Sequence, residues 1–173
     1  MAIMPIIVAP DPRLKIKARS IDQVDDAVRT LMDDMLETMY AANGIGLAAP
    51  QVGDDRRVIV VDVANKEDDP APMFMANPHI IDVGDDDRIH EEGCLSLPEH
   101  FAEVTRPDRV KIRYLDRDNE VREIEADEIL STCIQHEIDH LDGILFVDHV
   151  SALKRNMILR KLVKAKKLAQ QPA

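Results

Sequence analysis

The chain has 173 residues, of which 45% are hydrophobic and 32% charged, and its formal net charge is −11. This composition predicts a globular domain with a sizeable core and excludes a disordered chain; two cysteines, Cys94 and Cys133, are too few for a disulfide scaffold. No apolar run reaches membrane-spanning length and the first residues do not resemble a signal peptide, so we expect one cytoplasmic domain over residues 1–173.

In chain order, residues 25–42 carry apolar side chains at helical spacing. This pattern predicts an amphipathic helix with Asp22 as its N-cap and Gly44 as its stop. A glycine-containing loop is expected over residues 44–51. Residues 57–63 then form a β-branched run that is typical of a buried strand.

Short strands are predicted over residues 73–76 and 79–83, and the acidic run at 85–87 indicates an exposed turn. Residues 110–115 and 121–125 alternate polar and apolar side chains around a polar turn, which predicts a hairpin.

A central helix is predicted over residues 127–141, with Gly143 as its stop, followed by an extended segment at 144–147 and a last helix over 152–168. The whole pattern indicates an α+β fold, with a mixed or antiparallel sheet around a central metal-bearing helix and with N-terminal and C-terminal helices.

Charge is distributed unevenly. Residues 151–173 contain seven Lys or Arg and no acid, whereas residues 1–150 hold 15 basic and 33 acidic side chains, a formal charge of −18. The acidic body argues against DNA binding, while the basic C-terminal helix and tail could contact an anionic partner. The alternative for the tail is a solvated helix face.

Residues 136–140 (HEIDH) are the most informative motif. His136 and His140 lie four residues apart, so their imidazoles share one helix face and can bind a single metal ion. Glu137 lies close by and suits a general base acting on water at that ion. Two imidazoles in an apolar helix would be costly without such a partner.

A third ligand must come from outside this motif. The metzincin pattern requires a histidine at Phe146, and no glutamate follows Glu137, so downstream ligands of the peptidase type are excluded. Cys94, beside Gly93, is the better candidate, because a thiolate binds zinc or ferrous iron strongly and a Cys–His–His set leaves a position for water. Cys133, one turn before His136, is either a further ligand or, as we favour, an apolar wall. A Cys94–Cys133 disulfide is a further alternative.

Three segments together resemble the peptide deformylase family: residues 44–51 (GIGLAAPQ), 92–96 (EGCLS) and 135–140 (QHEIDH). Their order and separation also match, and the resemblance extends from Pro10 to the final helix. It implies a single catalytic domain of the bacterial type with a C-terminal helix. The implied reaction removes the formyl group from the N-terminal formyl-methionine of new polypeptides and releases formate.

The resemblance also implies residue roles. Cys94, His136 and His140 would bind the metal, usually Fe²⁺ with Zn²⁺, Ni²⁺ or Co²⁺ able to replace it. Glu137 would be the acid/base in an attack by metal-bound water on the formyl carbon. Gln51 and the backbone N–H of Leu95 would form the oxyanion hole; the alternative for Gln51 is a loop residue that binds its own backbone.

For the substrate, the resemblance implies that the peptide lies along the motif residues, pairing with Ile45 and Gly46 as an added strand. The remaining residues implied to contact substrate are Gly44, Glu92 and Gly93 beside the peptide and Ile129 and Cys133 in the methionine pocket; core packing is the alternative for Ile129. Two residues depart from the family pattern: His90 stands where an aliphatic residue is expected and Phe101 where a basic residue is frequent. These departures leave the fine specificity open.

Two other functions remain possible from the residues. A zinc endopeptidase shares the HExxH motif, and a formyl-peptide-binding or ribosome-binding relative could retain the fold without activity. Retention of Glu137 and Gln51 favours the hydrolase, because a binding protein does not need a base. The basic C-terminal helix suggests ribosome contact through RNA phosphates.

Overall fold

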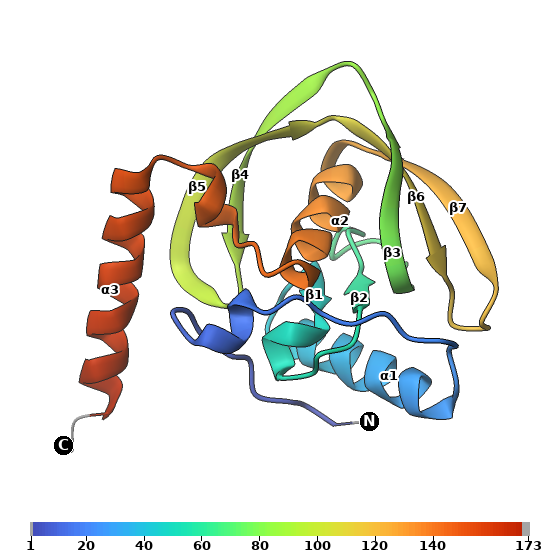
Figure 1. The fold of residues 1–173 in the computed structure, drawn as a ribbon, viewed down its shortest axis with the longest axis horizontal. Helices are drawn as coiled ribbons and strands as arrows, with labels where there is room; N and C mark the ends of the chain where they lie inside the picture. Colours follow the sequence, from blue (N-terminus) through green and yellow to red (C-terminus); the bar gives the residue numbers. More distant parts are fainter. Residues whose placement is uncertain (1, 171–173) are drawn as a thin grey trace.

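Helix α2 (Glu128–Leu141) lies at the centre of the fold, with strands on either side of it (Figure 1). The computed structural model describes residues 2–170. Residues 171–173 of the predicted C-terminal tail therefore lie outside the described part of the chain. The predicted α+β class is confirmed by this arrangement.

Five strands form the larger sheet in the order β1-β2-β3-β6-β7, and each neighbouring pair is antiparallel. Their bounds are β1 (Gly46–Ala48), β2 (Val58–Val61), β3 (Met73–Val83), β6 (Arg109–Leu115) and β7 (Val121–Asp127). A second sheet pairs β4 (Asp87–Cys94) with β5 (Leu97–Pro107), also antiparallel. Of the two sheet types predicted, the antiparallel one is correct for these strands.

The sequence of β2 is apolar throughout because both faces of the strand are buried. Ile59 and Val61 pack in the cluster that contains the apolar face of α2, while Val58 and Val60 pack with α1 (Asp26–Ala41). Since side chains alternate along a strand, this part of the sheet is sandwiched between the two helices. The sandwich fixes α2 against the sheet.

The N-terminal helix is one residue shorter at each end than predicted, and Asp22 is not its N-cap. The cap is Asp25, whose side chain accepts a hydrogen bond from the backbone N–H of Val28. At the other end, Asn43 takes a left-handed conformation with φ 58°, and the N–H of Gly44 donates to the Met39 carbonyl. Asn43 thus takes the role predicted for glycine.

Three other predictions are corrected by the structure. The expected loop at 44–51 contains β1 and a 3₁₀ turn, η2 (Ala49–Val52), because its backbone pairs with β2. Residues 73–83 form one strand, since a register shift between Ala76 and His79 accommodates the interruption. The expected extended segment at 144–147 leads into a 3₁₀ turn, η3 (Phe146–His149). Strands β4 and β5 were not predicted at all.

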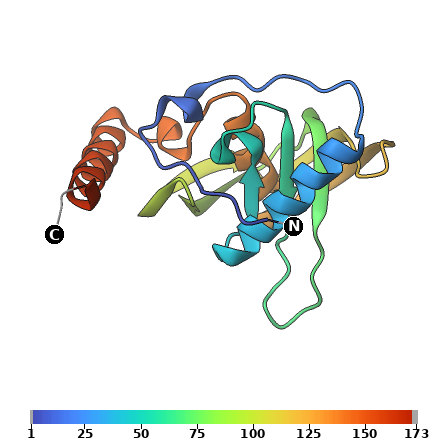
Figure 2. The same ribbon diagram turned by 90° about the horizontal axis from the view of Figure 1, so that it is seen from below.

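The C-terminal helix α3 (Ala152–Gln170) stands at one end of the molecule, and Figure 2 shows it apart from the sheets. It buries Ile158 and Leu162 against a cluster that includes Leu14, Leu97 and Phe146. A further 3₁₀ turn, η1 (Pro12–Lys15), supplies Leu14. Among the described residues, no helix has the length and apolar character that crossing a membrane requires.

Candidate active site

Helix α2 carries His136, Glu137 and His140 into the interior. All three are buried, with 8%, 4% and 1% of their surface exposed. The helix ends where predicted, with Gly143 in a left-handed conformation at φ 74°. The four-residue spacing brings the two imidazoles to 5.0 Å between ring centroids.

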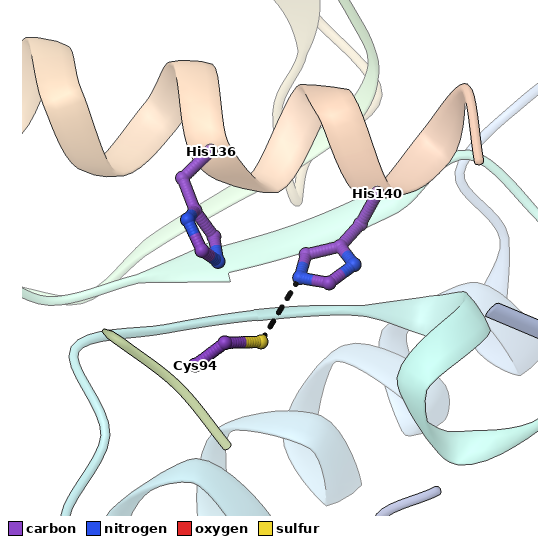
Figure 3. Close-up of side chains that lie close together, drawn as sticks. All are labelled: Cys94, His136 and His140. Atoms are coloured by element: carbon purple, nitrogen blue, oxygen red, sulfur yellow. Dashed lines mark hydrogen bonds between the residues drawn. The ribbon is translucent and has the colours of Figure 1, made fainter. Parts of the chain in front are cut away.

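Cys94 comes from a different element, the last position of β4. It pairs with Leu97 across a two-residue turn made by Leu95 and Ser96, so the hairpin directs its thiol toward α2. Its Sγ lies 3.3 Å from Nε2 of His140, and Figure 3 shows both imidazoles facing it. The ligand atoms of Cys94, His136 and His140 all lie within 4.8 Å of one another. The fold therefore brings the three predicted ligands together.

A network of hydrogen bonds holds the imidazole of His136 through Nδ1. Nδ1 of His136 lies 2.9 Å from Oε1 of Glu92, which leaves Nε2 for the cluster with Cys94. Arg106 donates to both carboxylate oxygens of Glu92 at 2.6 and 2.9 Å and to Asp139 at 2.8 Å. His149 lies 2.8 Å from the same Asp139 oxygen.

Arg106 places one cation between the carboxylates of Glu92 and Asp139. Burial opposes ionisation of Glu92, but hydrogen bonds from His136 and Arg106 outweigh it and lower the pKa of Glu92 to about 2. Glu92, which was predicted to lie beside the peptide, is thus also in a position to orient the imidazole of His136. Arg106 and Asp139 were not predicted, and for Arg106 the sequence offers no signal, since it lies 14 residues from Glu92.

Glu137 is held in a confined position. Strand β1 passes so close that a Cβ on Gly46 would lie 2.6 Å from Oε2 of Glu137 and 2.9 Å from Sγ of Cys133. The other carboxylate oxygen, Oε1, is buried without a hydrogen-bond partner among the described residues. Burial raises the pKa of Glu137 to about 7, a value suited to a group that takes up and releases a proton near neutral pH.

Gln51 bonds its own segment and also reaches across the site. Its Oε1 accepts from the backbone N–H of Ala48 at 3.0 Å, while its Nε2 donates to the Ser96 hydroxyl at 3.0 Å and toward the Cys94 thiol at 3.4 Å. The first bond corresponds to the alternative considered for this residue. The other two direct the amide N–H groups of Gln51 toward the turn that follows Cys94. Ser96 was not among the predicted site residues.

A cavity of about 500 Å³ opens beside these groups. It is lined by every predicted site residue except His140, namely Gly44, Ile45, Gly46, Gln51, Glu92, Gly93, Cys94, Leu95, Ile129, Cys133, His136 and Glu137. His90 and Phe101 line it as well. The cavity therefore connects the three-residue cluster with the predicted substrate-binding residues.

The two cysteines differ in environment. Both are free thiols, so the disulfide alternative is wrong. Cys133 is outside the three-residue cluster and lies 3.5 Å from the Ile45 carbonyl. Burial raises the pKa of the Cys133 thiol well above its usual range, which favours the wall of the cavity over a thiolate ligand.

Comparisons with known proteins show the family of the chain. The family model described as polypeptide deformylase matches residues 3–156. The peptide deformylase of Methylocella silvestris is 57% identical over 176 residues, covering 99% of this chain and 90% of that protein. The crystal structure of peptide deformylase from Ehrlichia chaffeensis superposes with a TM-score of 0.93 at 36% identity, covering 98% of this chain and 100% of that one. The same organism's enzyme in complex with actinonin gives a TM-score of 0.91 at 38% identity, with 95% and 98% covered.

Proposed function

The chain belongs to the peptide deformylase family, and we propose that Cys94, His136 and His140 hold the metal ion on which this family depends. It is a hydrolase that removes the formyl group from the N-terminal methionine of formylated nascent polypeptides. The observation that carries the assignment is the approach of three ligand atoms within 4.8 Å beside the buried Glu137.

The donor set fits a divalent transition metal. One thiolate and two imidazoles suit Fe²⁺, Zn²⁺, Ni²⁺ and Co²⁺, and the bond from His136 Nδ1 to Glu92 supplies the outer support typical of such ligands. We propose one Fe²⁺ per chain, with the other three able to replace it. When bound, the ion supplies a Lewis acid that makes a water molecule nucleophilic near neutral pH.

Glu137 performs the proton transfers. Its carboxylate takes a proton from the water whose oxygen attacks the formyl carbon, and it then gives that proton to the amide nitrogen as the C–N bond breaks. The products are formate and a free amine. The confined position of Glu137 between Gly46 and the cavity suits this role, because no other side chain or backbone group among residues 2–170 holds its Oε1 by a hydrogen bond.

Gln51 and the backbone N–H of Leu95 stabilise the oxyanion that forms on the formyl oxygen. The Ala48 bond to Gln51 Oε1 fixes the amide so that Nε2 is oriented before the substrate arrives. The peptide pairs with Ile45 and Gly46 as an added strand, and the methionine side chain enters the cavity toward Ile129 and Cys133.

Formate release from formyl-Met-Ala-Ser tests this assignment, using protein prepared without oxygen. We expect metal-dependent release, and a loss of about 10²–10³-fold in kcat for Gln51→Ala. Unformylated Met-Ala-Ser and a longer unblocked peptide are the controls. Cleavage inside the longer peptide would favour an endopeptidase, and formyl-peptide binding without release would favour an inactive relative.

We also propose that α3 contacts ribosomal RNA. Its seven Lys and Arg side chains occur without any acidic residue, and all except Arg155 are exposed. Replacing Lys154, Lys161 and Lys164 by glutamate should weaken co-sedimentation with ribosomes and reduce its salt dependence. If the variant co-sediments with ribosomes as the native protein does, and salt has no effect, α3 is a solvated helix face and does not bind RNA.

Two further proposals concern the extent of the domain and the location of the protein. We propose that residues 1–173 form one catalytic domain. A cytoplasmic location is proposed as well, because formylated nascent chains are made there.

A further inference from the structure

The N-terminal segment, residues 2–10, has no regular structure of its own but is held against the body of the protein. Residues 2–8 form neither helix nor strand. Ile7 and Ala9 are nonetheless buried, and both pack in the cluster that contains Leu97 of β5 and Leu162 of α3. Because the interior is closely packed, burial of these two side chains fixes the path of the segment.

The backbone of the same two residues is bonded to the active site. The N–H of Ile7 donates to the Gln51 carbonyl, and the N–H of Ala9 donates to the Ser96 carbonyl, each at 2.8 Å. The N–H of Val8, between them, donates to neither carbonyl. Both distances are those of well-formed N–H···O bonds. The segment therefore joins two turns whose residues Gln51 and Ser96 are 45 positions apart in the chain.

These two turns carry the proposed oxyanion donors. Gln51 lies in η2, and Leu95 and Ser96 form the turn between β4 and β5. Nε2 of Gln51 also donates to the Ser96 hydroxyl at 3.0 Å, so the turns are linked to each other as well as to the segment. Donors stabilise an oxyanion effectively when their positions are fixed before the reaction. Bonds that fix the two turns therefore act on both donors.

We infer that Ile7 and Ala9 are positioning residues for the hydrolysis. Their N–H groups hold the backbone of Gln51 and of the Leu95 turn at the spacing that the oxyanion on the formyl oxygen requires. Without either bond, one turn can shift, and a shift of a fraction of an ångström weakens its donor in the transition state more than in the bound substrate. This inference rests on the proposed function, because it requires Gln51 and Leu95 to be the oxyanion donors.

Amide-to-ester replacement tests the two bonds, because an α-hydroxy acid removes one backbone N–H and keeps the side chain. The replacement is made singly at Ile7, at Ala9 and at Val8, and kcat for formyl-Met-Ala-Ser is expressed per bound metal ion. We expect the Ile7 and Ala9 esters to lower kcat about five- to tenfold, with KM within about twofold of native. The Val8 ester is the matched control and should retain native kcat, since that N–H holds neither turn.

A double-variant cycle separates positioning from a general structural role. In the Gln51→Ala protein the donor that Ile7 positions is absent, so the Ile7 ester should change kcat by less than about twofold there. A purely structural defect would reduce kcat by the same factor with and without Gln51. If one ester does not fold, the other is compared with the Val8 ester in its place, because the two bonds hold different turns.

Equal kcat values for the three esters would overturn the inference, as would a loss at Ile7 that is the same in the native and Gln51→Ala backgrounds. Failure of the proposed function looks different. Gln51→Ala would then keep native kcat, or the native protein would release no formate, and either result overturns the inference as well. A large loss of kcat in Gln51→Ala together with native kcat in the Ile7 and Ala9 esters would overturn the inference alone.

Discussion

Helices α2 and α3 both lie in the C-terminal third of the chain, yet α2 buries ten of its 14 residues and α3 buries two of its 19. Both carry polar side chains, but their surroundings differ (Figure 1). On α2, His136 is buried and Asp139 is largely covered, so both depend on protein partners, and Glu92 and Arg106 supply them. On α3 the lysines stay hydrated and need none. Burial, more than residue type, decides which polar groups are bound into a site.

The largest difference between the helices should appear in catalysis. Glu137→Gln keeps the shape of the side chain and all three proposed ligands but removes the base, so we expect kcat to fall about 10²–10⁴-fold with metal content unchanged. Formate release and metal analysis measure the two effects. Arg160→Gln on α3 is the control and should retain native kcat; a kcat within twofold of native for Glu137→Gln would refute its role.

The next difference concerns buried charge. Arg106→Met leaves Glu92 and Asp139 without their cation in a buried site, so we expect the free energy of unfolding to fall by about 3–5 kcal/mol. Arg160→Met on the exposed face of α3 should change it by less than about 0.5 kcal/mol. Urea denaturation compares them. Similar losses in the two variants would mean that the network does not depend on Arg106.

Within α3 itself, two leucines differ in burial. Leu162 is 3% exposed and Leu168 is 59% exposed, so truncation to alanine should cost about 2–4 kcal/mol at the first position and less than about 0.5 kcal/mol at the second. Both variants should still release formate when folded. Equal stabilities by denaturation would show that α3 is not held by Leu162.

The smallest effect is expected at the junction between η1 and η3. Burial opposes ionisation of Asp148, but the Lys15 ammonium at 2.6 Å and the Leu145 N–H at 2.9 Å lower the pKa of its carboxyl. A pKa that is lower in the folded state gives stability that is present above the unfolded value, near 4, and lost as pH falls. Asp148→Asn should therefore reduce the free energy of unfolding by about 1 kcal/mol at pH 7. The difference from the native protein should shrink toward pH 3; a constant difference would contradict the linkage.

Local features of the fold followed from the sequence because they depend on neighbouring residues. Helical spacing predicted α1 and α2 nearly to their ends, and the alternation in residues 110–115 and 121–125 predicted the β6–β7 hairpin. Strands β4 and β5 were missed, since β4 has a single aliphatic residue, Ile89, and the buried face of β5 includes a charged one, Arg106. Only their mutual pairing makes them strands.

For the site, the HEIDH motif was enough to place His136 and His140 on one face with Glu137 next to His136, because helix geometry brings residues four apart together. The tertiary structure decided how Cys94 meets them, since this depends on the register of the β4–β5 hairpin against α2. It also decided that Glu92 and Arg106 support His136. Contacts between residues far apart in the chain depend on packing, which no local pattern of residues specifies.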